Sequence, residues 1–90
     1  MAQIIKTSGE VVEISPKNGT DFQLDEVKDV VGGWVEAINL RDGRLMLCDE
    51  EGKLKNKPVN IKATTIFHGA FRTSDFIVGD VLVCKEDELK

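Results

Sequence analysis

The sequence has few of the residues from which active centres are usually built. It contains one histidine, one tryptophan, two cysteines and no tyrosine. Cys48 and Cys84 form no Cys-x-x-Cys pair and stand at no ligand spacing from His68, so we expect no metal site. Both cysteines lie in apolar, strand-like runs, which predicts buried and reduced thiols.

Motifs for nucleotide hydrolysis are also missing. The chain has neither a Gly-x-x-x-x-Gly-Lys loop nor a Gly-x-Gly-x-x-Gly turn, and its eight glycines fall at expected turns. The acidic runs 49–51 and 86–88 are typical of solvated faces rather than of metal ligands. Since no pair of nucleophile and base is apparent, we expect a protein that is not an enzyme, with no catalytic residues and no cofactor.

Long apolar runs and excess positive charge are absent as well. No stretch approaches the ~18 apolar residues of a membrane span, and no basic leader precedes an apolar segment. Twelve Lys and Arg against 16 Asp and Glu leave a formal net charge of −4, which gives no support to duplex binding. We therefore expect a cytoplasmic protein with neither a membrane nor duplex nucleic acid as its partner.

The residues that are present predict one folded domain over 1–90, since 41% are hydrophobic and 31% are charged. Short β-branched runs, an Asp42-Gly43 hairpin signal and glycines after an apolar stripe mark the elements. Strands are expected at 3–7, 10–14, 34–40, 45–48 and 76–84, and helices from Thr20 or Asp21 to Val31 and from Asn60, as the cap, to near Gly69.

This order predicts an α+β fold, with two short helices and a curved, mostly antiparallel sheet of about five strands, in the order ββαββαβ. We expect both helices on one face of the sheet and a frayed tail at 85–90. The continuous apolar run 45–48 indicates a central strand that is covered on both faces.

Several segments, in this order, give the chain a resemblance to a known family. It resembles a small domain of unknown function that bacteriophages, plasmids and integrated elements encode. The segments that carry the resemblance are Val31-Gly32-Gly33-Trp34-Val35-Glu36, Asp42-Gly43-Arg44, Glu50-Glu51-Gly52-Lys53-Leu54, Pro58-Val59-Asn60, Ala63-Thr64 and Val78-Gly79-Asp80-Val81-Leu82-Val83. The resemblance implies a phage-type accessory protein in the host cytoplasm, acting against host defence, and it implies no chemistry.

Seven residues form the predicted ligand site. Glycines admit a ligand to the backbone, an indole can stack on a base, arginine and lysine attract phosphate, and an amide can bond to a base. These residues are Gly32, Gly33, Trp34, Arg44, Lys53, Asn60 and Arg72. Several of these residues could instead have no part in binding. Trp34 could cap the core, the arginines could be solvated, and Asn60 could serve only as a helix cap.

Pairing across the hairpin should place Trp34 opposite Glu50, so we expect Trp34 and the basic segment 53–62 to face the same ligand. The leading hypothesis is a homo-oligomer that sequesters a nucleotide-derived signalling molecule between protomers without hydrolysing it. The alternative is a protein-binding inhibitor that presents an acidic face, with Asp49, Glu50, Glu51 and the acids of the tail exposed, to a host defence protein. An enzyme that acts on nucleotides is a third and weaker alternative.

Overall fold

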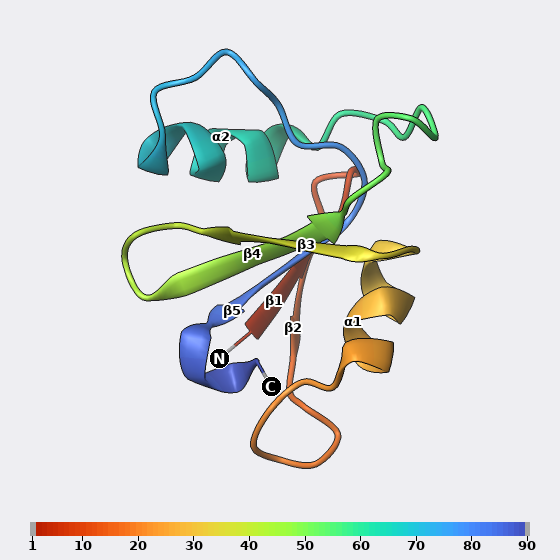
Figure 1. The fold of residues 1–90 in the computed structure, drawn as a ribbon, viewed down its shortest axis with the longest axis vertical. Helices are drawn as coiled ribbons and strands as arrows, with labels where there is room; N and C mark the ends of the chain where they lie inside the picture. Colours follow the sequence, from red (N-terminus) through yellow and green to blue (C-terminus); the bar gives the residue numbers. More distant parts are fainter. Residues whose placement is uncertain (1, 90) are drawn as a thin grey trace.

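A computed structural model describes residues 2–89 of the chain (Figure 1). Within these residues, five strands and two α-helices follow one another in the order ββαββαβ, which confirms the predicted fold class. The elements are β1 (Ala2–Ile5), β2 (Val11–Ile14), α1 (Leu24–Val31), β3 (Val35–Asn39), β4 (Arg44–Asp49), α2 (Ile61–Ala70), β5 (Val81–Lys85) and the 3-10 turn η1 (Glu86–Glu88). Neither α-helix in this part of the chain is long and apolar enough to cross a membrane.

The strands form one open sheet in the order β2-β1-β5-β4-β3, and every neighbouring pair is antiparallel. The last strand in the sequence, β5, therefore lies in the middle of the sheet, while β2 and β3 form its edges. In β4, Met46 and Leu47 are both fully buried although they point to opposite faces. This confirms that the apolar run 45–48 is a central strand with cover on both sides.

The two helices lie on opposite faces of the sheet, so the expectation of one covered face was wrong (Figure 1). On one face Ala63 of α2 packs in a core with Met46 of β4 and Val83 of β5. On the other face Val27 of α1 packs with Leu82 of β5. Since β4 and β5 are apolar on both sides, a helix on a single face would leave the other row of apolar side chains in water.

The ends of the helices agree only partly with the sequence. Asn60 caps α2 by accepting a hydrogen bond from the Ala63 backbone N–H at 3.0 Å, and Gly32 ends α1 with a φ of 82°. Both features were predicted. The expected cap of α1 at Thr20 or Asp21 was wrong, because Gln23 precedes the helix and makes no side-chain cap.

Residues 85–89 of the C-terminal tail are ordered instead of frayed, which corrects a second expectation, and residue 90 lies outside the described residues. Leu89 forms a β-bridge with Phe22, and the Glu88 carbonyl oxygen accepts a hydrogen bond from the Phe22 N–H at 2.6 Å. Phe22 is only 1% exposed, and Leu89 packs against the core on the α1 side. The tail therefore helps to close that core.

Candidate functional site

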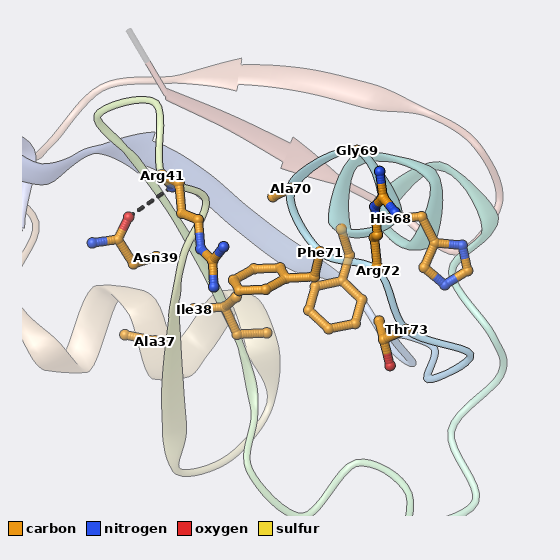
Figure 2. A pocket seen from close by; sticks show the side chains of 11 residues that line it. Ala37, Ile38, Asn39, Arg41, His68, Gly69, Ala70, Phe71, Arg72 and Thr73 are labelled. Atoms are coloured by element: carbon orange, nitrogen blue, oxygen red, sulfur yellow. Dashed lines mark hydrogen bonds between the residues drawn. The ribbon is translucent and has the colours of Figure 1, made fainter.

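A wide groove runs between the edge strand β3 and the C-terminal end of α2 (Figure 2). We call it the β3–α2 groove, and its volume is about 1150 Å³. Residues from β3, the following turn, α2 and the segment after α2 line it: Ala37, Ile38, Asn39, Arg41, Phe67, His68, Gly69, Ala70, Phe71, Arg72 and Thr73. Two segments about 30 positions apart in the chain thus meet at one edge of the sheet.

Arg41 and Phe71 form the centre of the groove. The Arg41 guanidinium lies 4.5 Å from the centroid of the Phe71 ring (Figure 2). The Phe71 ring lies in turn 5.2 Å from the Phe67 ring, centroid to centroid, with the two planes tilted by 43°. Arg41 takes a left-handed backbone conformation, with a φ of 67°, and its N–H donates to the Asn39 side chain at 2.8 Å. That turn aims the guanidinium at the aromatic pair, where cation–π attraction and hydrogen bonding to an anion can act together.

The groove carries positive charge although the chain as a whole is acidic. Arg41 and Arg72 line it, and none of its described lining residues is a carboxylate. Arg72 is exposed and makes no ion pair within residues 2–89. His68 turns away from Phe71 (Figure 2) and bonds through Nε2 to the Asp75 carbonyl oxygen at 2.7 Å. Because a carbonyl only accepts, this nitrogen is protonated, and the imidazole fixes the segment after α2.

Of the seven predicted site residues, only Arg72 lies in this groove. Arg44 lines an adjoining hollow, where it pairs with Asp42 at 2.8 Å. Asn60 is fully buried: its side-chain N–H groups donate to the carbonyl oxygens of Ile5 and Gly79, at 2.8 and 2.9 Å. Its amide is fully used in joining α2 to β1, and it offers nothing to a ligand.

Gly32 and Gly33 make room for lysine side chains of the same chain. A Cβ atom on Gly33 would lie 2.6 Å from Lys55 Nζ, and one on Gly32 would lie 3.0 Å from Lys57 Nζ. Lys57 Nζ also donates to the Val31 carbonyl oxygen, at 2.6 Å, at the end of α1. The two glycines thus allow the segment 53–57 to dock on the helix C-terminus, where cations are favourable.

Asp49 holds these two lysines, which corrects its expected exposure. Its side chain is 1% exposed and lies 2.7 Å from Lys57 Nζ and 2.9 Å from Lys55 Nζ. Burial alone would raise the pKa of Asp49, but the hydrogen bonds from Lys57 and Lys55 lower it to about 2. Asp49 therefore belongs to an internal ion cluster and not to an acidic outer face.

Trp34 lies on the surface rather than in the core, with 59% of its area exposed and Lys28 Nζ 3.9 Å from the ring centroid. Its carbonyl oxygen accepts a hydrogen bond from the Glu50 N–H at 2.8 Å, which confirms the predicted register. Lys53, however, pairs with Asp75 and lines a hollow that also contains Glu36 and Glu50, among other acidic residues. The surroundings of Lys53 are therefore acidic, unlike those of Arg41 and Arg72.

A family model described as a domain of unknown function, DUF3846, matches residues 2–90. The chain belongs to this family. No curated protein and no solved structure matches it. Membership of DUF3846 confirms the predicted resemblance at the level of a small domain of unknown function.

In this DUF3846 domain, sequence reasoning did not select Arg41, Phe67, Phe71 or His68. The available signal was the mixture of aromatic and basic side chains within residues 67–72. Arg41 joins them only because the β3–β4 turn and the end of α2 meet at the same end of the molecule. No set of three potential metal ligands gathers among the residues that the structure describes.

Proposed function

We propose that this protein is a small, non-catalytic accessory protein of phage type that sequesters a nucleotide-derived signalling molecule in the β3–α2 groove. The observation that carries the proposal is the composition of that groove. In a chain with a net charge of −4, it presents Arg41, Arg72 and two aromatic rings and no carboxylate among its described lining residues. A host defence system that uses such a molecule as its signal would be silenced by its removal.

Each part of such a ligand finds a partner in the groove. The guanidinium groups of Arg41 and Arg72 can hold phosphate oxygens in a bidentate manner, which lysine cannot do. Phe71 offers a ring on which a base can stack. The volume of about 1150 Å³ exceeds the ~300–1,000 Å³ of typical small-molecule pockets, which favours a ligand larger than a mononucleotide.

Binding without hydrolysis agrees with the state of the nucleophilic side chains. Burial raises the pKa of Cys48 to about 12 and that of Cys84 to about 11, so both thiols stay protonated at neutral pH. In the groove, Nε2 of His68 is already hydrogen-bonded to the Asp75 carbonyl oxygen. Neither thiol can therefore attack a phosphate, and the bond at Nε2 holds the imidazole turned away from Phe71 at the centre of the groove (Figure 2).

Titration calorimetry against a panel of cyclic dinucleotides and cyclic ADP-ribose isomers tests the proposal. We expect at least one member to bind, and Arg41→Ala or Arg72→Ala to weaken binding about tenfold or more, since a charged hydrogen bond contributes about 1.5–3 kcal/mol. Arg44→Ala is the matched control, because Arg44 is already paired with Asp42 and should matter less.

Absence of heat with every member of the panel at high concentration would refute the proposal. Recovery of intact ligand from the heated complex separates sequestration from hydrolysis, because an enzyme would release a cleaved product. A ligand that binds equally well to all three arginine variants would place the site elsewhere on the surface.

The second candidate function is a protein-binding inhibitor of a host defence protein. Its support is the acidic hollow beside β3, which the exposed Glu50 and Leu54, the latter 81% exposed, help to line. Glu51, the next residue in the chain, is exposed as well. Charge on such a surface steers association with a basic partner. A stoichiometric protein partner in a host-lysate pull-down, lost on Glu50→Lys with Glu51→Lys, would favour this function, whereas co-purified ultraviolet-absorbing material would favour the first.

A further inference from the structure

The outer edge of β3 has backbone groups free to pair with another strand. Two hydrogen bonds show which residues of β3 turn their backbone groups towards β4. The Leu40 N–H donates to the Arg44 carbonyl at 3.0 Å, and the Glu50 N–H donates to the Trp34 carbonyl at 2.8 Å. The N–H and C=O groups of residues 35, 37 and 39 therefore point away from β4. No strand of the described chain covers them, because β3 ends the sheet (Figure 1).

The two ends of this edge carry opposite charge on the same face of the sheet. Glu36 lines a hollow together with Phe67 of α2, and the Arg41 guanidinium lies over Phe71, just beyond the end of α2. Between them stands Ile38, half-buried against the α2-side core. An antiparallel copy of the same strand would therefore bring its positive end to this negative end, with an apolar residue at the centre.

The opposite edge of the sheet lacks this complementarity. β2 carries Glu13 near its centre, and Glu10 stands just before its first residue. Self-pairing of β2 about Glu13 would bring the two Glu13 carboxylates together, and β2 itself carries no basic side chain that another register could set opposite them. Charged residues on edge strands normally prevent such pairing. The distribution of charge therefore favours self-pairing at the β3 edge over self-pairing at the β2 edge.

We infer that β3 pairs antiparallel with β3 of a second copy of this chain, about a two-fold axis at Ile38. In this register Ala37 lies opposite Asn39 of the second copy. The backbone N–H and C=O groups of both residues point away from β4, so they form hydrogen bonds with one another. Glu36 then lies beside Arg41 of the second copy, and the two Ile38 side chains touch on the α2 side. A register centred on Glu36 would instead bring the two Glu36 carboxylates together.

The pairing also changes the β3–α2 groove. Ala37, Ile38 and Asn39 line the groove, so the second copy would close its open side at the sheet edge. The two grooves would share the axis at Ile38, and Arg41 and Arg72 of both copies would face one space. The pairing itself requires no ligand, and it stands or falls independently of the proposed function.

Sedimentation equilibrium of the purified protein without ligand tests the pairing. We expect the wild-type chain to form dimers, and Ala37→Pro to leave monomers, because proline removes an outward N–H that only the second copy can use. Glu13→Pro is the matched control, since it removes the equivalent group on the edge of β2 and should leave the dimer intact.

A charge exchange tests the register even if the proline variant fails to fold. Glu36→Arg alone places like charges together and should raise the dimer dissociation constant about tenfold. Combining it with Arg41→Glu restores opposite signs and should recover the wild-type constant. A wild-type protein that stays monomeric at all concentrations, a dimer lost only with Glu13→Pro, or a double variant no better than Glu36→Arg would each overturn the inference.

Discussion

Replacement of Asp49 by asparagine should remove a defined, pH-dependent part of the stability. The carboxylate accepts hydrogen bonds from Lys57 at 2.7 Å, from Lys55 at 2.9 Å and from the Glu51 N–H at 2.9 Å. Asparagine keeps the shape of the side chain but removes the negative charge that both ammonium groups face. Lys57 retains its bond to the Val31 carbonyl, so the segment 53–57 should stay docked but more weakly.

The size of the effect follows from the pKa of Asp49. It falls from 3.8 to about 2 on folding, a difference of about 1.8 pH units, which corresponds to about 2 kcal/mol. Because the folded-state pKa is the lower one, the unfolded chain binds a proton first as the solution is acidified. This stabilisation is therefore complete above about pH 5 and disappears as the pH falls through 4 towards 2.

Urea unfolding followed by far-ultraviolet circular dichroism between pH 2 and 7 measures this contribution. Asp49→Asn should be about 2 kcal/mol less stable than wild type at pH 7, and the gap should close by pH 2. Asp29→Asn, at an exposed carboxylate on α1, is the control and should lie within about 0.5 kcal/mol of wild type at pH 7. A gap for Asp49→Asn that stays constant with pH would refute the reasoning, because the loss would then come from packing and not from ionisation.

Three further changes test the described contacts, each by thermal or urea unfolding. Gly33→Ala should cost about 1–3 kcal/mol because its Cβ would lie 2.8 and 2.9 Å from the two carboxylate oxygens of the buried Asp49, whereas Gly69→Ala, with open space around its Cβ position on α2, should gain about 0.5–1 kcal/mol; equal effects would contradict this account. Asn60→Ala should cost about 2–4 kcal/mol because three buried backbone groups would lose their hydrogen-bond partner, and a neutral result would show that water replaces the amide. Trp34→Ala should change stability by less than about 1 kcal/mol, and a loss near the ~3–5 kcal/mol of a core tryptophan would contradict the exposed position.

Most elements could be predicted because their signals are local. The Asp42-Gly43 turn, the cap at Asn60 and the left-handed Gly32 each act within a few residues. The placement of the two helices depends instead on the insertion of β5 between β1 and β4, which pairs residues about 80 positions apart, such as Gln3 and Val83. The pattern of residues within one element does not predict such a long-range pairing.

The candidate site was harder to predict than the fold for the same reason. Gly32 and Gly33 gave a correct signal that something approaches the backbone closely, but the approaching groups are Lys55 and Lys57 of the same chain. Arg72 was selected for its chemistry, while Arg41 lies beside Phe71 only through the meeting of a turn with a distant helix end. Residue type predicts what a side chain can bind, and the fold decides which side chains act together.

The two buried thiols offer a way to watch each face of the sheet separately. Cys48 belongs to the core under α2, and Cys84 belongs to the core under α1. Both thiols are buried, so an alkylating reagent reaches Cys84 only when its layer opens, whereas Cys48, which lines the hollow beside β3, becomes reachable when α2 lifts and widens that hollow. Cys48 thus reports the lifting of α2, the helix that forms one wall of the groove, and Cys84 reports the release of α1 or the C-terminal tail. Two different labelling rates would mean that the layers open independently, and a single shared rate would mean that the sheet opens as one unit.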